Sequence, residues 1–232
     1  MFDITTRTLG ELVAEVPGRA AAFDRVGLDY CCHGHRSLGE ACVAAGLDAA
    51  MVATQLEDIG AAGAAGEHPE YPTEPAALTD FIETTHHRYL HDELPALDAL
   101  AAKVCDVHRK RHPELADVHR LVAELRTELE PHLLKEERVL FPAIRALAGG
   151  AREFPFGTVA NPVRMMSREH DRCGELLVEL RAVTRDHAVP DDACASYRSL
   201  YERLAALEAD THRHIHLENN VLFPAALAAE AA

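Results

Sequence analysis

Two segments of the chain carry the same arrangement of histidine, glutamate and proline. HLLKEERVLFP and HIHLENNVLFP both read His-x3-Glu and both close in Leu-Phe-Pro, so that His132 and Glu136 correspond to His214 and Glu218. Residues i and i+4 of a helix share one face, so each His–Glu pair points in one direction. Imidazole and carboxylate groups together suit iron, zinc or manganese. The two segments therefore predict metal chemistry.

A further histidine precedes each segment at nearly the same distance. His87 lies 45 positions before His132, and His170 lies 44 positions before His214. The two His-x3-Glu segments are themselves 82 positions apart. This repeat indicates two similar helical hairpins, each of which offers one histidine and then a His-x3-Glu pair.

A four-helix bundle directs side chains from all its helices to one axis, where the repeated residues would meet. Buried carboxylates are costly unless they are paired or bound to metal. Six ligands with internal two-fold symmetry favour two metal ions, each held by two histidines and bridged by both glutamates, with open positions for an oxo group, water or a diatomic molecule. The predicted ligands are His87, His132, Glu136, His170, His214 and Glu218. For either segment alone, the ordinary alternative is an exposed i,i+4 pair; the joint spacing of all six residues argues against it.

Composition and charge are typical of an acidic all-α protein. Hydrophobic residues make up 48% of the 232 residues, Trp is absent, and no long Val/Ile/Thr alternation occurs. The formal net charge of −15 argues against a nucleic-acid partner. No apolar run approaches the roughly 20 residues that span a membrane, and no signal peptide is apparent. Six cysteines without an export signal are expected to be free thiols, so we expect a cytoplasmic protein.

The chain divides at a segment rich in glycine and proline. Residues 1–62 are predicted to form a small helical domain, residues 63–74 a linker, and residues 75–232 the bundle. In the small domain, Ser37 followed by Glu40 is a capping-box pattern that predicts the start of a helix.

Four long amphipathic helices are expected in the bundle, because apolar residues recur at helical spacing. Their predicted ranges are 76–104, 113–147, 159–186 and 191–228. Pro131 falls inside the second helix, and we expect it to kink or loosen the turn immediately before His132.

These motifs resemble a known family. HHRYLHDELP, HLLKEERVLFP, EHD and HIHLENNVLFP look like the hemerythrin-like domain of the iron–sulfur cluster repair di-iron proteins, and GLDYCCHGHRSL looks like the short Cys-Cys domain that precedes it. The resemblance covers nearly the whole chain. It implies an up-down hemerythrin-like bundle whose six predicted ligands hold two iron ions, oxo-bridged when oxidised, with both glutamates bridging.

Two departures from related patterns are informative. Many family members follow Cys-Cys with two glycines, whereas this chain has His33-Gly34-His35, so both histidines are candidate additional ligands. Oxygen-carrying hemerythrins end in His-x4-Asp. Here that position is Asn219, and Glu218 stands one earlier, which agrees with the repair branch.

The resemblance implies repair or protection of iron–sulfur clusters damaged by nitric oxide or oxidants, with iron donated to damaged or apo iron–sulfur proteins. Cys31 and Cys32 would accept or relay iron, or act as thiols; the alternative is two small buried residues in a tight turn. A sensor of nitric oxide or oxygen and a nitric oxide reductase would use the same site, so the sequence leaves open whether the protein is an enzyme. The apolar helices of the small domain suggest a homodimer.

Other residues are predicted to support the metal site or the core. Glu169 is a candidate to orient a ligand, the alternative being a solvated charge. His86 could line an access path. Packing is expected for the remaining cysteines: Cys42, Cys105, Cys173 and Cys194.

Overall fold

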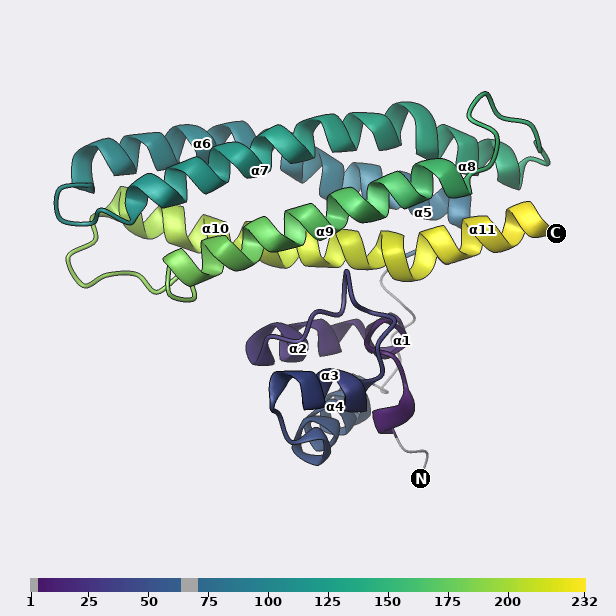
Figure 1. Ribbon diagram of the computed structural model, residues 1–232, viewed down its shortest axis with the longest axis horizontal. Coiled ribbons are helices and arrows are strands. Elements are labelled where there is room, and N and C mark those ends of the chain that lie inside the picture. Colours follow the sequence, from purple (N-terminus) through teal and green to yellow (C-terminus); the bar gives the residue numbers. More distant parts are fainter. Residues whose placement is uncertain (1–3, 64–70) are drawn as a thin grey trace.

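The computed structural model describes residues 4–63 and 71–232 (Figure 1). These residues are mostly helical and include no β-strand, which confirms the all-α prediction. A small unit of short helices lies against one long side of an extended helical bundle. Within the described residues, no helix is both long enough and apolar enough to cross a membrane.

The N-terminal unit is built from four short helices and two 3-10 turns. These elements are η1 (Ile4–Thr6), α1 (Leu9–Glu15), η2 (Pro17–Arg19), α2 (Ala20–Val26), α3 (Leu38–Ala45) and α4 (Ala49–Gly63). The expected capping box begins α3, because Ser37 Oγ accepts from Glu40 N and the Glu40 carboxylate accepts from Ser37 N at 3.1 Å. A second capping box, of Thr8 and Glu11, begins α1. Side-chain caps of this kind replace the missing backbone partners and add about 1 kcal/mol each.

The bundle consists of four long helical rods, three of which contain one π-helical turn. The elements are α5 (Pro75–Ile82), η3 (Glu83–His87), α6 (Arg88–His108), α7 (Leu115–Lys135), η4 (Glu136–Leu140), α8 (Phe141–Ala148), α9 (Ala160–Val183), α10 (Ala195–Leu217), η5 (Glu218–Leu222) and α11 (Phe223–Ala231). Helix α6 packs on α7 and α10, α7 packs on α9, and Arg181 of α9 donates to Glu208 of α10 at 2.8 Å, so the rods form a closed bundle. The expected four-helix architecture is therefore confirmed. Most of the expected linker, residues 64–70, lies outside the described residues, and the domain boundaries stay a prediction.

The irregular turn expected at Pro131 is found in a different place. Helix α7 runs unbroken through Pro131, and the wide turn η4 begins only at Glu136. There the N–H of Phe141 bonds to the carbonyl of Glu136, five residues back. Pro142, which has no backbone N–H, follows directly after this wide turn. The loosened turn expected before His132 is therefore absent, and that part of the prediction was wrong; a kink at Pro131 stays a prediction.

Apolar side chains enclose the middle of the bundle on both sides. Toward the α6–α7 connection, buried leucines of all four rods form one cluster that continues into the small unit. Toward α8 and α11, a second cluster contains Phe141 and Phe223, the two phenylalanines of the Leu-Phe-Pro repeats. The polar residues of the repeat lie between these clusters, shielded from solvent.

Candidate metal centre

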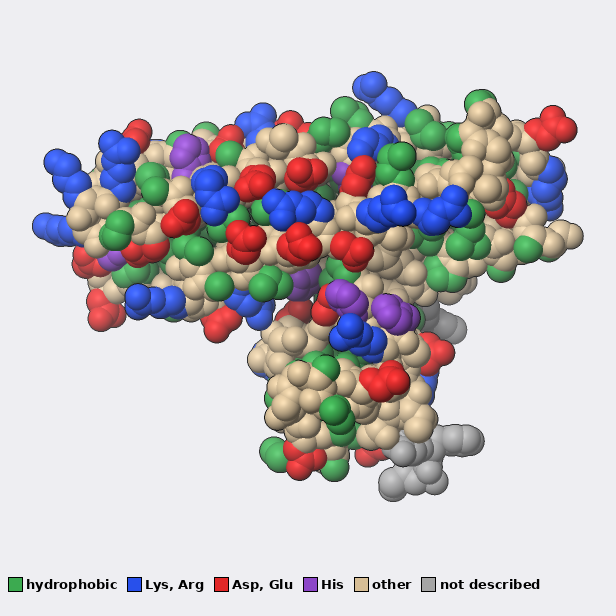
Figure 2. Space-filling model, in the orientation of Figure 1, with side chains coloured by type: hydrophobic (Ala, Val, Ile, Leu, Met, Phe, Trp, Pro, Cys, Tyr) green, Lys and Arg blue, Asp and Glu red, His purple; other side chains and the backbone are tan. Residues whose placement is uncertain are grey.

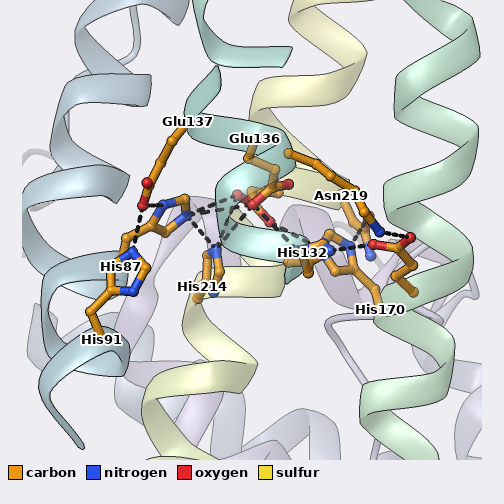
Figure 3. A network of polar contacts seen from close by, with 11 residues as sticks. His87, His91, His132, Glu136, Glu137, His170, His214 and Asn219 are labelled. Atoms are coloured by element: carbon orange, nitrogen blue, oxygen red, sulfur yellow. Dashed lines mark hydrogen bonds and ion pairs between the residues drawn. The ribbon is translucent and has the colours of Figure 1, made fainter. Parts of the chain in front are cut away.

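All six residues singled out by the repeat meet in the middle of the bundle (Figure 3). His87 ends η3, His132 and Glu136 bracket the end of α7, His170 lies in mid-α9, and His214 and Glu218 mark the end of α10. Their side chains are 0–2% exposed. Phe141 stacks on the His87 ring and Phe223 on the His170 ring, at centroid distances of 5.3 and 6.0 Å.

The imidazoles form two pairs that each join different hairpins. His87 Nε2 lies 3.2 Å from His214 Nε2, and His132 Nε2 lies 3.2 Å from His170 Nε2. Two nitrogens bound at right angles to one ion, each at about 2.1 Å, would be about 3 Å apart. The observed spacing therefore matches two ligands of one metal ion in each pair. The repeat could not reveal this pairing, because it depends on which rods are neighbours.

Each glutamate faces one histidine of both pairs. Glu136 Oε2 lies 3.3 Å from His132 Nε2 and 3.5 Å from His87 Nε2. Glu218 Oε1 lies 3.0 Å from His214 Nε2, and its Oε2 lies 3.0 Å from His170 Nε2. Both carboxylates thus belong to two four-residue groups, each of which could hold an ion. This is the arrangement that two bridging carboxylates require.

Several buried atoms of the centre lack a directed hydrogen bond. Both oxygens of Glu136 and Oε2 of Glu218 have no partner in hydrogen-bond geometry, although imidazole nitrogens lie within 3.5 Å of the Oε2 atom of each glutamate. The Nε2 atoms of the imidazoles and the carboxylate oxygens of Glu136 and Glu218 instead surround the same two positions, which a metal ion could occupy. Leaving a buried carboxylate uncompensated is costly, so the donor set fits cations.

Electrostatics of the metal-free centre lead to the same conclusion. Burial opposes protonation of His87 and His132, but Glu136 and Glu218 outweigh it and raise the pKa of each imidazole to about 10. Burial would also raise the pKa of Glu136, yet the neighbouring imidazoles hold it below its ordinary value. Without metal, two imidazolium ions therefore balance two carboxylates. Metal ions must displace these protons.

Three of the four imidazoles have a polar side chain in contact with Nδ1, the ring nitrogen that faces away from the centre. Glu137 Oε1 contacts His87 Nδ1 at 3.1 Å, Glu169 Oε2 contacts His132 Nδ1 at 3.0 Å, and Asn219 Oδ1 contacts His170 Nδ1 at 2.9 Å. Such contacts fix the tautomer and aim Nε2 at the centre. The orienting role predicted for Glu169 agrees with its contact, whereas Glu137 and Asn219 were not predicted as orienting residues. Both directly follow a predicted bridging glutamate, which is the signal that could have identified them.

The fourth imidazole, His214, is supported differently. Its Nδ1 has no hydrogen-bond partner among the described residues. Its ring instead lies parallel to that of His86, at a centroid distance of 5.7 Å, and His86 is held by Asp210 at 2.9 Å. His86 is buried behind a predicted ligand, where it supports the His214 ring.

Comparison with known proteins agrees with this geometry. Residues 80–226 match the model of the hemerythrin HHE cation binding domain, and residues 5–60 match a domain of unknown function named ScdA_N. Iron-sulfur cluster repair protein YtfE from Musicola paradisiaca is 37% identical and covers 97% of this chain and 98% of its own length. The proteins of the same name from Edwardsiella ictaluri and Escherichia coli are 36% and 32% identical, each covering at least 95% of both chains.

This chain belongs to the hemerythrin-domain family of iron-sulfur cluster repair proteins. The resemblance read from its motifs is confirmed, and the two His/Glu groups of this family member fit a di-iron site.

In this family member, the Cys-Cys loop lies directly over one edge of the metal centre. Cys32 Sγ contacts the carbonyl of His170 at 3.6 Å, and Asn219 Nδ2 donates to the carbonyl of Cys31 at 3.3 Å. Asn219 therefore joins the imidazole of His170 to the loop. Asn220 adds donors to the same loop, at 3.2 Å from the carbonyl of Tyr30. The small unit is thus bonded to the residues that follow Glu218 and to a predicted ligand.

The two thiols differ in environment. Cys31 is buried, and its Sγ lies 3.8 Å from Cys32 Sγ and 3.2 Å from Asp29 Oδ1. The hydrogen bond with Cys32, together with burial, raises the pKa of the Cys31 thiol well above its ordinary value. Cys32 is half-buried and borders a cavity of about 800 Å³ between the small unit and helices α9 and α10.

Asp29 organises this loop, and it was not among the predicted residues. Its Oδ1 accepts from the backbone N–H groups of Cys31 and Cys32 at 3.1 and 2.9 Å. Asp29, Cys31 and Cys32 are close enough to hold one metal ion together. His33 is paired with Asp29 at 2.6 Å, whereas His35 is exposed and has no place in this group.

Proposed function

We propose that this protein repairs iron–sulfur clusters by supplying iron from the centre between its four helical rods. The observation that carries the proposal is the pair of His/Glu groups that share both carboxylates, in a chain related over nearly its whole length to iron-sulfur cluster repair proteins. Bound iron would supply a redox-active metal that can also be given up to a cluster.

The proposed ligands are His87, His132, Glu136, His170, His214 and Glu218. Four neutral imidazoles and two carboxylates offset only part of the charge of two iron ions, which favours moderate retention over permanent binding. Phe141 and Phe223 exclude water from one side of the centre through their contacts with ligand rings. Glu137, Glu169 and Asn219 hold three rings in orientation.

Cys31 and Cys32 are proposed to accept or relay iron at the loop above His170. Two thiols and the carboxylate of Asp29 offer three ligand atoms within one metal-sized space. Cys32 borders the cavity between the domains, which gives a partner protein access to the sulfur. A partner would be an iron–sulfur protein with a damaged or missing cluster.

Metal content and repair test the proposal together. Two irons per chain after anaerobic reconstitution, and restoration of a damaged [4Fe–4S] hydratase by the iron-loaded protein, are expected. The double variant Cys31→Ser and Cys32→Ser should keep both irons but lose repair, whereas Cys105→Ala, a buried position in α6, should lose neither. Zinc in place of iron would refute the proposed iron centre. Full repair by the double variant would refute the proposed role of Cys31 and Cys32.

The small ligand, the assembly and the compartment are further parts of the proposal. Nitric oxide or oxygen would bind the iron centre as small ligands; steady consumption of nitric oxide without cluster repair would instead indicate a reductase.

Val43 and Met51, which are 81% and 65% exposed on the small unit, support a homodimer that light scattering can test. Six free cysteines support a reducing, cytoplasmic location, which imaging of a tagged protein can test.

A further inference from the structure

Thr211 of α10 is buried, and its hydroxyl has no hydrogen-bond partner among the described residues. Thr79 and Thr184, the other threonines that are buried in the described part of the chain, each donate to a backbone carbonyl of the preceding turn, at 2.6 and 2.7 Å. Helical threonines ordinarily make this bond. A buried hydroxyl without a partner destabilises the folded chain. Thr211 therefore carries a polar group that the packing of the protein does not use.

Thr211 lies one helical turn from the metal centre, on the face of α10 that carries two proposed ligands. It precedes His214 by three residues and Glu218 by seven, and these spacings bring side chains to the same side of a helix. Three helical residues rise about 4.5 Å. Thr211, His214 and Glu218 are all 0% exposed. The Thr211 side chain therefore lies inside the bundle, directly beside the centre.

The equivalent positions of the other three rods are apolar. One residue of each rod lies three positions from a ligand histidine, on the side of the α6–α7 connection: Leu90, Leu129, Cys173 and Thr211. None of these four is more than 2% exposed, whereas charged side chains of both signs cover the outer face of the bundle in Figure 2. Leu90, Leu129 and Cys173 belong to the apolar cluster on that side. The four residues form a layer beneath the centre in which Thr211 alone has a hydroxyl.

The cysteine of this layer packs as predicted. Cys173 is buried, as are Cys42 and Cys105. Cys194 is exposed instead, because it is the N-cap of α10 and not an internal helix residue, so its predicted packing was wrong. Burial raises the pKa of the Cys173 thiol, which therefore stays a weak S–H donor. Thr211 is thus the stronger hydrogen-bond donor of the layer.

The opposite side of the centre is closed by aromatic rings. Phe141 stacks on a ligand ring there, and so does Phe223. Both belong to the apolar cluster toward α8 and α11. The side that faces Thr211 is therefore the one left for a small ligand. A hydrogen bond made within an apolar layer is strong, because no water competes for the donor.

We propose that Thr211 binds the small ligand of the iron centre, by donating its hydroxyl proton to a nitrogen or oxygen atom of that ligand. Nitric oxide, oxygen and the anion azide belong to this class, because each is small and offers a lone pair. The hydroxyl gains a partner when such a ligand binds, so stability lost in the free protein is recovered as affinity. The inference rests on the iron centre of the proposed function and not on cluster repair.

Azide binding to the oxidised, iron-loaded, full-length protein tests the proposal, with visible absorbance as the readout. Thr211→Val keeps nearly the same shape without the hydroxyl, and we expect it to weaken azide binding about tenfold, the effect of one buried hydrogen bond. Thr211→Ser restores the hydroxyl and should restore most of the affinity. Thr79→Val is the matched control. Its hydroxyl is equally buried but bonded to the carbonyl of Ala76, so this variant should bind azide as wild type does.

A second measurement needs neither iron nor ligand. In the metal-free protein, Thr211→Val removes an unpaired hydroxyl and should raise the thermal unfolding midpoint by about 2–4 °C. Thr79→Val breaks an existing hydrogen bond and should lower the midpoint. A hydroxyl that served only to stabilise the fold would not give a variant with higher stability and weaker ligand binding.

The proposal is overturned if Thr211→Val binds azide as tightly as wild type, if Thr211→Ser binds it as weakly as Thr211→Val, or if Thr211→Val lowers the metal-free midpoint. Loss of iron from Thr211→Val would also overturn it, because the hydroxyl would then support the irons and not their small ligand. Elemental analysis of wild type separates this failure from that of the proposed function. Without two irons per chain in wild type, the proposed iron centre would itself be wrong, and this inference with it.

Discussion

Asn219 provides a direct test of how the small unit influences the metal centre. Its Oδ1 accepts from Nδ1 of His170 at 2.9 Å, while its Nδ2 donates to the carbonyl of Cys31 at 3.3 Å. We expect Asn219→Ala to weaken binding at the ion held by His132 and His170, and to leave the other ion less affected.

The magnitude follows from the tautomer that each state requires. When Nε2 of His170 binds metal, its proton must sit on Nδ1, and without Asn219 that buried N–H has no acceptor. An unpaired buried donor costs about 1–3 kcal/mol. In the metal-free protein the proton can move to Nε2, which lies 3.0 Å from Glu218 Oε2. The penalty therefore falls mainly on the bound state and weakens that ion's affinity by about 5- to 140-fold.

Competition with a ferrous chelator measures this effect, because iron leaves a weakened site faster and at lower chelator concentration. Asn220→Ala is the matched control. Asn220 donates to the carbonyl of Cys31 at 3.1 Å but contacts no proposed ligand. The variant of Asn219 should release one of two irons faster than both wild type and the Asn220 variant. Equal release from both variants would refute the reasoning, because the loop contact alone would then explain the change.

Three further outcomes are expected. Glu136→Gln removes one of two shared carboxylates and should reduce iron from two ions per chain to one or none, as measured by elemental analysis; retention of two would contradict bridging by Glu136 and Glu218. Removal of iron by a chelator should lower the thermal unfolding midpoint of the bundle, because an ion that binds only the folded state stabilises it by about 2.7 kcal/mol at 100 times its Kd. Glu208 is buried and bonded to Arg181 at 2.8 Å and to His187 at 2.6 Å; burial raises its pKa, but these partners outweigh burial and lower it below 4.5. Its stabilising contribution is therefore complete above about pH 4.5 and is lost as the pH falls through the lower, folded-state pKa. Acid titration of wild type and Glu208→Gln should show this loss only in wild type.

Much of the fold was predictable because helical periodicity and the two His-x3-Glu segments are local patterns. The i,i+4 spacing already places His132 and Glu136 on one face, whatever the rest of the chain does. The capping box of Ser37 and Glu40 is equally local, since three residues separate its members. Pro131 misled the prediction of a loosened turn, because α7 continues in α-helical form through this proline to Lys135.

Other features depended on contacts between segments far apart in the chain. The hairpin repeat is compatible with imidazole pairs within one hairpin or between the two, and the structure pairs them between hairpins, His87 with His214 and His132 with His170. Which rods are neighbours is a property of the closed bundle and not of either segment. The same holds for the contact of Cys194 with His108, residues from helices that meet only in the folded chain.

The sequence by itself determined the helical class, the six polar residues of the repeat and the presence of two thiols in a loop, because composition and short spacing set these. Tertiary structure alone decided which atoms face one another. It placed both glutamates between the imidazole pairs, held three rings from behind with Glu137, Glu169 and Asn219, and bonded the Cys-Cys loop to one of these orienting residues. Such contacts depend on distances of about 3 Å between separate helices, which only the packing of the apolar clusters around them can set.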